Sequence, residues 1–562
     1  MLCALGAIGA ATAVGGVVAT GSPAQNGDVR TYVVLLDPSA STDQATQSIQ
    51  AAGGSVERIN TAVGVATVRS TAADFAAEAV TQPGIQGTAA DRSIGQVPAE
   101  SRTKRDRDAI EELTAERNAA RGQQGATPDA ATPGDPLASL QWDMQMMHAT
   151  VTGSYREQQG TKDVRVGIID TGVDGSHPDI APNFDAALSR NFTVDDPVID
   201  GACDTDPDGS CEDPANVDEN GHGTHVAGTI GAPLNGLGMA GVAPRVDIVN
   251  LRAGQDSGYF FIQPVVDALT YAGDHGIDVV NMSFYIDPWL YNCASNPADT
   301  PEQQQEQQTI IEATKRALAY AHDRGVTLVA ADGNENTDLG RPEFDPTSPD
   351  YPTPKSAHDR NVDNSCLSLP TEGEGVIGVT SVGPSGRKAY YSNYGTEQAD
   401  VSAPGGDYYD FPGTDKNAKP TNLILAPYPE AVGRAADPAT IDAAGNPTTP
   451  FVVKDTKNGQ TAYYQYIQGT SMASPHAVGV AALIVSQFGK RDRFQGGLTL
   501  APDRVQNIMQ KSATDTACPS PRQYEYGGLP ADYNAYCEGP VKRNGFYGDG
   551  VVDALAAIHA RD

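Results

Sequence analysis

The sequence is short of basic residues. Across 562 residues, 38 Lys and Arg stand against 71 Asp and Glu, which gives a formal net charge of −33. Such a surface repels nucleic acid and anionic membranes, so we expect neither as a partner. Aromatic residues are also few, at 6%, although the hydrophobic fraction of 39% is ordinary for a globular protein. A chain of this length can bury a large core and form more than one folding unit.

The sequence contains no Cys-x-x-Cys pair, which argues against a zinc ribbon. One cysteine, Cys3, lies in an N-terminal apolar segment. The other six are Cys203, Cys211, Cys293, Cys366, Cys518 and Cys537. An even number in an exported chain favours disulfides, and proximity in sequence favours Cys203–Cys211 and Cys518–Cys537, which leaves Cys293 for Cys366. Six free thiols in a cytosolic protein are the alternative.

The N-terminal segment lacks charged residues. Its first 20 residues are apolar and small, and Ser22, Pro23 and Ala24 follow as a small-residue cleavage site. No positive flank follows the apolar run, so residues 1–25 are predicted to be a secretory signal peptide rather than a membrane anchor, and the protein is predicted to be secreted (extracellular). The basic residues that usually open a signal peptide are missing, as expected if translation starts further upstream.

Two further segments precede the main part of the chain. Residues 29–97 are predicted to form a compact unit, because strand-like apolar runs alternate with stretches of helical composition that start at Ser or Thr. The strands are expected at 31–36 and 64–68 and the helices at 41–54 and 71–80. Residues 98–134 are first charged and then rich in Pro and Ala, which is the composition of an exposed linker that is open to cleavage.

From residue 135 to residue 562, apolar runs alternate with helical stretches. The runs are continuously hydrophobic, which predicts strands buried on both faces, and therefore an α/β fold with a parallel β-sheet and helices on both sides. The predicted strands are 164–170, 246–251, 277–284, 326–331 and 376–382, and the predicted helices are 261–276, 308–325 and 474–489. In such sheets the chemistry gathers at the carboxyl ends of the strands.

Four polar residues lie next to these elements in positions that suit catalysis. Asp170 closes an apolar strand, where a carboxylate either orients a histidine or forms a turn. His222 lies among glycines in NGHGTHVAGT, residues 220–229. Ser471 begins a helical run, where free backbone N–H groups suit a developing oxyanion, although an N-cap is the simpler alternative. Asn334 follows another strand, and its amide either donates to the same oxyanion or belongs to a turn.

In the order Asp170, His222, Asn334 and Ser471, these residues resemble the subtilisin family of serine endopeptidases. The matching stretches are IIDTGVDGSHPDI, NGHGTHVAGTI, GMAGVAP, VVNMS, VAADGN and GTSMASPHAVGVAAL, with GDGVVDALAA near the end. The resemblance implies that Ser471 is the nucleophile, that His222 is the general base held by Asp170, and that Asn334 is an oxyanion donor. It also implies a subtilisin-like fold, protein or peptide substrates, and no cofactor for catalysis.

The second histidine of the motif, His225, is expected to be structural. A metal site formed by His222 and His225 is disfavoured, because the pair lacks the His-Glu-x-x-His spacing and its general-base glutamate.

The resemblance also gives roles to the segments before residue 135. Residues 29–97 are similar to the family's inhibitor-type propeptide, a ferredoxin-like α+β unit that assists folding and blocks the cleft. The enzyme is therefore expected to be a self-inhibited zymogen, with its own propeptide as intramolecular inhibitor. Residues 135–144 look like the start of the mature catalytic domain, 135–562. A catalytically silent binding protein and a transpeptidase or ligase are the alternatives, and the complete set of four residues favours the endopeptidase.

Several stretches depart from the family pattern. Phe284 and Tyr285 stand where glycine usually lines the primary specificity pocket, so a narrowed or reshaped pocket is expected. Residues 253–261 match the edge strand that pairs with an extended substrate. The long insertion at 406–466 is interpreted either as a flap or exosite or as a solvated loop.

Structural calcium is implied at two places. Asp179 and Asn235 fall where many subtilisins bind it. The acidic loop between Cys203 and Cys211 mimics the first half of a calcium loop, but its twelfth position, Ala215, is not the glutamate that such a loop needs. The residues concerned are Asp204, Asp206, Asp208 and Gly209. A disulfide-tied acidic loop without an ion is the alternative.

Overall fold

The fold is that of a computed structural model, which describes residues 29–90, 110–111, 113–129, 131–197, 199–205, 209–351, 356–493 and 495–561. The predicted signal peptide, residues 1–25, lies outside the described residues. The same is true of Asp206 and Asp208 in the acidic loop.

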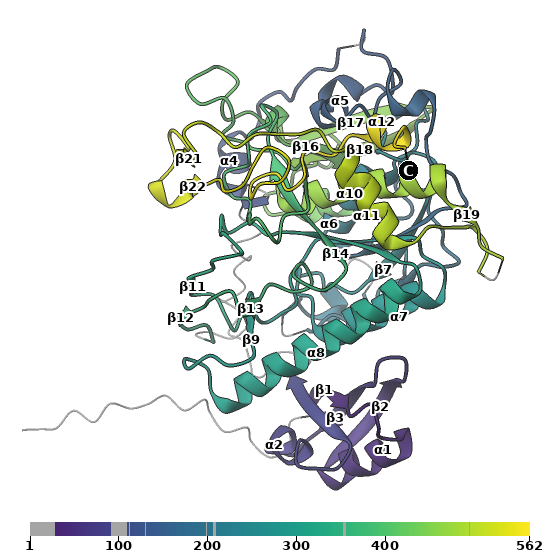
Figure 1. The fold of residues 1–562 in the computed structure, drawn as a ribbon. Coiled ribbons are helices and arrows are strands. Elements are labelled where there is room, and N and C mark those ends of the chain that lie inside the picture. The colour runs from purple at the N-terminus through teal and green to yellow at the C-terminus, as the bar shows by residue number, and fades with distance from the viewer. Residues whose placement is uncertain are drawn as a thin grey trace, which may run out of the picture.

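A seven-stranded parallel sheet forms the centre of the molecule (Figure 1). In spatial order its strands are β15 (Val401–Pro404), β14 (Val376–Val382), β10 (Thr327–Ala331), β8 (Val279–Met282), β5 (Arg165–Ile169), β7 (Asp247–Arg252) and β6 (Arg190–Asn191). All neighbouring strands run parallel. The five predicted strands are confirmed, because each apolar run is buried on both faces of the sheet.

Helices cover both faces of this sheet, which confirms the predicted α/β fold. On one face lie α6 (His222–Gly231), α10 (Thr470–Phe488), α11 (Pro502–Ser512) and α12 (Ala554–Ile558), and on the other α7 (Ile262–Asp274) and α8 (Pro301–Asp323) (Figure 1). Each side encloses its own hydrophobic core. The helix α8 begins seven residues before the predicted start, because Thr300 and Gln303 form a capping box and Pro301 occupies the first turn.

The helix α10 runs through the core of the catalytic domain. Among the described residues it alone is long and apolar enough to cross a membrane, but 83% of its most apolar stretch is buried inside the protein. Pro475 lies within it and has no backbone N–H to donate to the Ser471 carbonyl one turn earlier. The Ser283 hydroxyl donates to that carbonyl instead, at 3.1 Å, so the start of the helix is held by the end of β8.

Residues 29–90 form a separate antiparallel sheet with two helices. The chain order is β1 (Arg30–Leu36), α1 (Thr42–Ala51), β2 (Gly54–Asn60), β3 (Val65–Ser70), α2 (Phe75–Ala79) and β4 (Ile85–Ala90), and the spatial order of the strands is β2–β3–β1–β4. This is a ferredoxin-like arrangement. The strands β2 and β4 were not predicted, because GSVERIN is largely polar and IQGTAA is made of small residues.

This N-terminal unit rests on α7 and α8 (Figure 1). The backbone N–H of Ala90, at the end of β4, donates to Glu306 Oε1 of α8 at 3.1 Å, and the Thr309 hydroxyl donates to the Thr88 carbonyl at 3.1 Å. Gly87 lies so close to α8 that a Cβ there would stand 2.3 Å from the Thr309 hydroxyl. A glycine at this position therefore lets the strand approach the helix.

The insertion at 406–466 is a folded layer and not a solvated loop. It contains an antiparallel sheet in the order β16 (Ile424–Pro427), β18 (Gln460–Ile467) and β17 (Val452–Lys457), together with α9 (Glu430–Ala435). Tyr464 and Tyr466 are fully buried in its core. Two buried histidines of the catalytic domain bond to its backbone: His177 Nε2 to the Tyr463 carbonyl at 3.0 Å, and His225 Nε2 to the Ile424 carbonyl at 3.1 Å.

The described part of residues 98–134 packs against this insertion rather than extending into solvent. Leu113 is buried in the core of the insertion, and α4 (Thr114–Ala119) follows it. The Tyr409 hydroxyl donates to Glu116 Oε1 at 2.7 Å, and Arg121 donates to two backbone carbonyls of the insertion. A segment with linker composition is thus ordered by a partner surface that its own sequence does not reveal.

Candidate active site

The predicted nucleophile, the predicted general base and the carboxylate expected to hold that base come from three elements. Asp170 directly follows β5, His222 is the first residue of α6, and Ser471 is the second residue of α10. Asp170 is fully buried, and its Oδ1 accepts hydrogen bonds from His222 Nδ1 at 2.7 Å and from the Thr171 backbone N–H at 2.8 Å. Because a carboxylate accepts hydrogen bonds, the proton of the neutral His222 ring lies on Nδ1. Nε2 is then the ring nitrogen that can accept a proton.

A second buried carboxylate, Asp218, holds the loop before His222. Its Oδ1 accepts from the Gly221 backbone N–H at 2.8 Å and the Thr171 hydroxyl at 3.1 Å. Its Oδ2 accepts from the Thr224 backbone N–H at 2.9 Å and the Thr224 hydroxyl at 2.6 Å. Asp218 therefore ties the turn after β5 to the start of α6, and burial raises its pKa. The sequence analysis did not identify Asp218. The one local feature that could have pointed to it is its position just before the glycine-rich stretch that contains His222.

Asn334 follows β10 with its amide in a fixed orientation. Its Oδ1 accepts hydrogen bonds from both the backbone N–H and the hydroxyl of Thr470, each at 2.9 Å. Because these donors define which end of the amide is oxygen, Nδ2 must point the other way. Asn334 and Ser471 line the same small pocket. The structure thus brings together all four residues that the sequence singled out.

One further side chain occupies the same place, and the sequence analysis did not identify it. Glu111 is 3% exposed. Its Oε1 accepts from the Ser471 hydroxyl at 2.7 Å and from Asn334 Nδ2 at 3.0 Å, and its Oε2 lies 3.5 Å from His222 Nε2. The segment of residues 110–129 therefore reaches the predicted nucleophile.

His225 lies on α6 behind His222, in the structural position that was expected for it. Its Nε2 lies 3.1 Å from the carbonyls of both Ile424 and Gln465. Burial lowers the pKa of His225 to about 3, so the ring is neutral at physiological pH and donates from Nε2. Its role is to join α6 to the insertion sheet.

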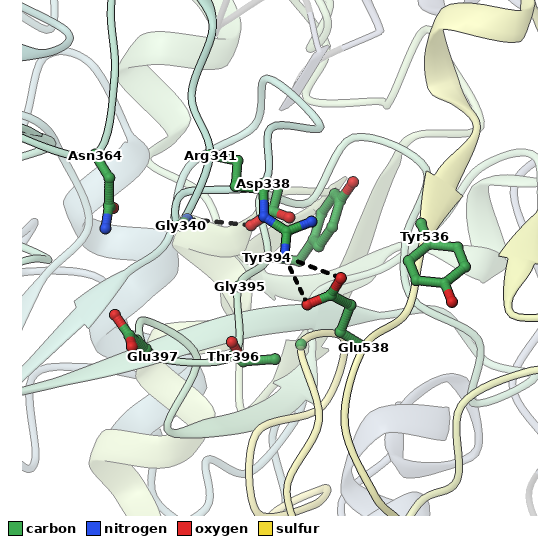
Figure 2. Close-up of a pocket in the computed structure, with 11 residues that line it drawn as sticks. Asp338, Gly340, Arg341, Asn364, Tyr394, Gly395, Thr396, Glu397, Tyr536 and Glu538 are labelled. Atoms are coloured by element: carbon green, nitrogen blue, oxygen red, sulfur yellow. Dashed lines mark hydrogen bonds and ion pairs between the residues drawn. The ribbon is translucent and has the colours of Figure 1, made fainter.

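A polar surface pocket lies apart from these residues (Figure 2). Asp338, Tyr394 and Tyr536 line part of it, and an ion pair between Arg341 and Glu538, 2.9 Å long, crosses it. None of the four predicted site residues lines this pocket. The Arg341 side chain is 66% exposed, so the ion pair contributes little to stability.

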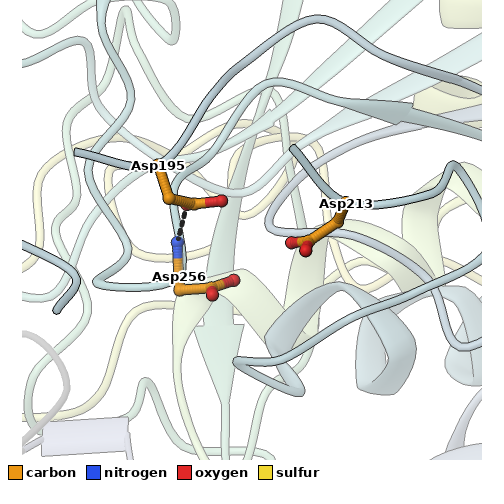
Figure 3. Close-up of side chains that lie close together, drawn as sticks. All are labelled: Asp195, Asp213 and Asp256. Carbon is orange, nitrogen blue, oxygen red and sulfur yellow. Dashed lines mark hydrogen bonds between the residues drawn. The ribbon is translucent and has the colours of Figure 1, made fainter. Parts of the chain in front are cut away.

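Three aspartates lie close enough together to suggest a metal centre (Figure 3). They are Asp195, Asp213 and Asp256. A guanidinium already fills the space between them: Arg252 pairs with Asp213, with Asp195 at 2.8 Å and with Asp256 at 3.0 Å, and it is fully buried. Burial raises the pKa of Asp256 to about 8. The cluster therefore neutralises a buried arginine next to the acidic loop.

The surroundings of Asp179 and Asn235 do not fit the calcium ion that the family resemblance implies. Asp179 accepts from Asn235 Nδ2 at 2.9 Å, from the Met239 backbone N–H at 3.2 Å and from the Tyr464 hydroxyl at 3.0 Å. The Lys457 ammonium donates to the Asn235 carbonyl. Oxygens that would bind calcium thus accept hydrogen bonds instead, and burial raises the pKa of Asp179 to about 8.

The edge strand predicted at 253–261 is not formed. The strand β7 ends at Arg252, and the chain turns immediately afterwards. The Gly258 backbone N–H donates to the Gln255 carbonyl at 2.8 Å, and the Gln255 N–H donates to the Tyr259 carbonyl at 3.0 Å. The sequence QDSG within this stretch is rich in residues that favour turns. In the described chain these residues form a turn and do not pair as a strand.

A small pocket opens beside Ser471, between the ends of β8 and β10. Its lining residues include Ser283, Phe284, Tyr285, Leu290, Glu335, Ser368 and Thr371. The Phe284 ring stacks on Phe260 with centroids 4.2 Å apart, and the Tyr285 hydroxyl donates to Asp350 at 3.2 Å. The two bulky residues therefore help to shape this pocket, each fixed by a partner outside it.

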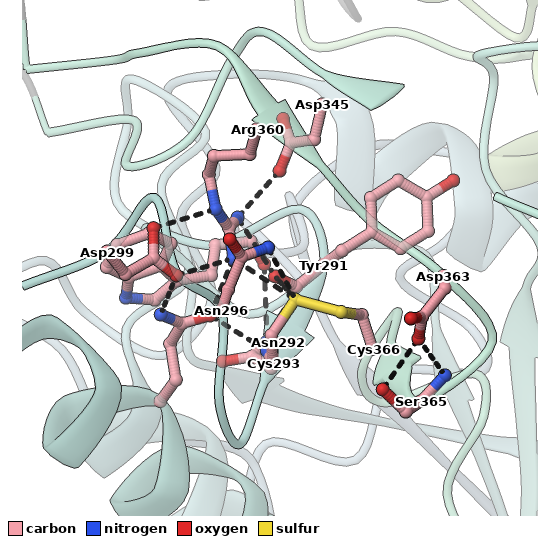
Figure 4. The surroundings of a disulfide bond; sticks show 12 residues. Tyr291, Asn292, Cys293, Asn296, Asp299, Asp345, Arg360, Asp363, Ser365 and Cys366 are labelled. Atoms are coloured by element: carbon pink, nitrogen blue, oxygen red, sulfur yellow. Dashed lines mark hydrogen bonds and ion pairs between the residues drawn. A yellow bond between two sulfur atoms is a disulfide. The ribbon is translucent and has the colours of Figure 1, made fainter. Parts of the chain in front are cut away.

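A disulfide lies in the same buried cluster as Leu290, one of the residues that line this pocket (Figure 4). Cys293 pairs with Cys366, and Arg360 packs beside the bond, donating to Asp345 at 2.8 Å and to Asp299 at 3.0 Å. All three charged residues are buried, and Arg360 forms ion pairs with both aspartates. The other two disulfides are Cys203–Cys211 and Cys518–Cys537, so the pairing expected from the sequence is confirmed.

Fold and site together define a class of protein. A carboxylate, an imidazole and a serine hydroxyl at the carboxyl edge of a parallel sheet are the arrangement of a serine hydrolase. The chain belongs to the subtilase family, whose sequence profile matches residues 161–529. It is a serine-type peptidase, which acts on peptide or protein substrates and needs no cofactor for catalysis.

Several characterised proteins are similar to the chain. Thermitase of Thermoactinomyces vulgaris is 27% identical over 376 residues, which cover 66% of this chain and 92% of that protein. Subtilisin DY of Bacillus licheniformis is 27% identical over 361 residues, which cover 64% of this chain and 87% of that protein.

Solved structures support the fold. The epidermin leader peptide processing serine protease of Staphylococcus aureus superposes with a TM-score of 0.60 at 20% identity, covering 95% of this chain and 98% of that one. Fervidolysin of Fervidobacterium pennivorans superposes with a TM-score of 0.54 at 19% identity, covering 96% of this chain and 62% of that one.

Proposed function

We propose that the protein is a secreted endopeptidase that works through an acyl-enzyme. Ser471 Oγ attacks the scissile carbonyl while His222 Nε2 takes its proton, and Asp170, hydrogen-bonded to the ring at 2.7 Å, stabilises the imidazolium. The imidazolium then protonates the leaving amine, and water releases the acyl group. The observation that carries this proposal is that the Ser471 hydroxyl, the Asn334 amide and the ring of His222 all lie within 3.5 Å of one carboxylate, that of Glu111, and so surround a single point.

The oxyanion of the tetrahedral intermediate is bound by Asn334 Nδ2 and the backbone N–H of Ser471. Thr470 contributes by fixing the far end of the Asn334 amide with two hydrogen bonds of 2.9 Å. An amide that is already oriented needs no reorganisation when charge develops on the substrate oxygen, which is why such donors are effective.

We further propose that the enzyme is made as a self-inhibited zymogen, with the unit of residues 29–90 as its intramolecular inhibitor. The packing of this unit on α7 and α8 supports the proposal, because Glu306 and Thr309 of α8 bond to the backbone of β4 as it leaves the unit. The end of β4 is thereby held at a fixed point on the catalytic domain.

Export is supported by three disulfides, because such bonds form and persist in an oxidising extracellular medium. We infer that calcium has no role at Asp179 and Asn235, where the Tyr464 hydroxyl and the Lys457 ammonium supply the hydrogen bonds and positive charge that an ion would otherwise provide.

The test of the proposed function is the intact mass of the secreted protein, wild type beside Ser471→Ala. Ser486→Ala, on the same helix but bonded only to the Ala482 carbonyl, is the matched control. We expect the wild type and the control to lose the segment before the catalytic domain and Ser471→Ala to remain uncut. If all three remained uncut, the chain would be a silent scaffold. If all three were cut alike, processing would occur in trans. Cleavage of an added peptide by wild type and by Ser471→Ala would then test whether Ser471 is the nucleophile.

A further inference from the structure

A carboxylate from the segment before the catalytic domain occupies the place where an oxyanion forms. Glu111 Oε1 accepts hydrogen bonds from the Ser471 hydroxyl at 2.7 Å and from Asn334 Nδ2 at 3.0 Å. Its Oε2 lies 3.5 Å from His222 Nε2. A single side chain therefore contacts the nucleophile, the oxyanion donor and the general base of the proposed mechanism.

A carboxylate in this position cannot be turned over. A scissile peptide presents a carbonyl carbon that bears an amine, which departs once His222 protonates it. An ionised carboxylate has no such leaving group, and its negative charge makes its carbon resistant to attack by a hydroxyl. Its oxygens instead match the donors that await the tetrahedral intermediate, and hydrogen bonds to a charged acceptor are the strong ones.

We propose that Glu111 is a built-in inhibitor of Ser471, so that the segment of residues 110–129 silences the active site directly. The inference rests on the proposed function and adds to it: the folded N-terminal unit is not the only inhibitory element. The Ser471 hydroxyl, whose hydrogen is directed to Glu111, is withheld from His222 for as long as the segment stays in place.

The chain around Glu111 is built to hold this position. The Gln468 backbone N–H donates to the Glu111 carbonyl at 3.1 Å, and the Gln468 side chain donates to the Ile110 carbonyl at 2.9 Å. Gly469 leaves room for the glutamate, because a Cβ there would lie 3.0 Å from both Cγ and Oε1 of Glu111. The next residue, Thr470, orients Asn334 through its hydroxyl. The three residues before Ser471 therefore all help to place Glu111 or its hydrogen-bond donor.

The insertion anchors the rest of the segment. Leu113 is buried with Tyr408 and Leu423, and Glu116 accepts from the Tyr409 hydroxyl at 2.7 Å. Arg121 donates to the carbonyls of Pro438 and Ala439, at 3.2 and 3.0 Å. The insertion therefore acts as the platform on which the inhibitory segment is displayed, which gives this departure from the family pattern a function.

The test measures how fast Ser471 reacts in the uncut, full-length chain. A fluorescent fluorophosphonate probe is added to freshly prepared protein, and label in the full-length band is followed by gel. Glu111→Ala should label roughly 10- to 100-fold faster than wild type, the factor that corresponds to loss of a charge-assisted hydrogen bond. Glu111→Gln should fall in between, because its amide oxygen accepts from the same donors without the charge.

The control is Asp129→Ala, which removes a carboxylate of the same segment that bonds only to the nearby Ala131 backbone N–H. It should label at the wild-type rate. The proposal is overturned if uncut Glu111→Ala and Glu111→Gln label as slowly as wild type while cut enzyme labels rapidly, since inhibition then belongs to the N-terminal unit alone. If cut enzyme and every variant fail to label, the proposed function fails as well. If Glu111→Ala does not fold, the labelling rate of Glu111→Gln tests the proposal, because glutamine keeps the size of the side chain.

Discussion

The chain before residue 135 meets the catalytic domain in two places, and the two contacts are built differently. The N-terminal unit uses an apolar face: Val33, Leu35 and Ala89 belong to the same buried core as α7 and α8. The segment around Glu111 instead places one buried carboxylate on the reacting groups and holds it mostly by hydrogen bonds.

The strand β1 shows how the first contact arises. Its residues alternate, so that Val33 and Leu35 face α8 while Tyr32, Val34 and Leu36 face the helices of the unit itself. Apolar burial supplies affinity in proportion to area and without directional demands. Hydrogen bonds to a carboxylate depend on direction and act at a single point. The N-terminal unit thus supplies binding, whereas the segment at Glu111 supplies blocking.

The largest expected effect comes from the residue that serves both catalysis and the Glu111 contact. Asn334→Ala removes an oxyanion donor, and kcat of the mature enzyme should fall about 10²- to 10³-fold with little change in KM, because the donor acts in the transition state. The measurement is steady-state cleavage of a chromogenic peptide. A rise in KM at unchanged kcat would mean that Asn334 only binds substrate.

The apolar contact should yield the next largest effect. Leu35→Ala removes a side chain buried against α7 and α8, which costs about 2–3 kcal/mol, so the dissociation constant of the cleaved unit should rise roughly 30- to 150-fold. The readout is how much of the unit remains with the catalytic domain after self-cleavage and dilution. Val56→Ala, a similar truncation packed against the unit's own core, should leave retention unchanged. Equal retention for Leu35→Ala and wild type would place the affinity elsewhere.

The sequence predicted the central sheet, and it singled out four residues that the structure places close together, because these signals are local. Asp170 and Asn334 each follow an uninterrupted apolar run, and Ser471 opens an apolar helix, so the rule that parallel strands direct their carboxyl ends to one edge brings them together. The family pattern then specified which histidine faces the serine.

The parts that escaped prediction depend on contacts between distant segments. Nothing in AIEELTAERN distinguishes Glu111 from Glu112 or Glu116. Contacts with the insertion and with Gln468, both distant in sequence, place Glu111 on Ser471. In the same way, Asp179 suggested calcium by its place in the motif, but Tyr464 and Lys457 reach that region from the insertion. Residues 253–261 show the reverse case, in which a local turn preference outweighed the family pattern.

The smallest expected effect concerns acid, and it separates the two contacts by their chemistry. His225 donates to the Ile424 carbonyl of the insertion, and burial lowers its pKa to about 3 from an ordinary value near 6.5. Between these pH values the unfolded chain binds a proton that the folded chain does not, so the free energy of unfolding falls as the pH drops, by about 2 kcal/mol between pH 7.5 and pH 5.

His225→Gln keeps a donor for the carbonyl but does not titrate, so its free energy of unfolding should fall by about 2 kcal/mol less over the same interval. Urea unfolding at both pH values, in a Ser471→Ala background to prevent self-cleavage, measures the difference. Identical losses in the two proteins would show that His225 does not carry the acid sensitivity of the insertion. His225 bonds to the insertion that supports the segment carrying Glu111, so its share of the acid sensitivity acts on that support. The contact on α8 has a titrating group of its own, Glu306, whose pKa is raised by burial, so acid acts on the two contacts through different groups.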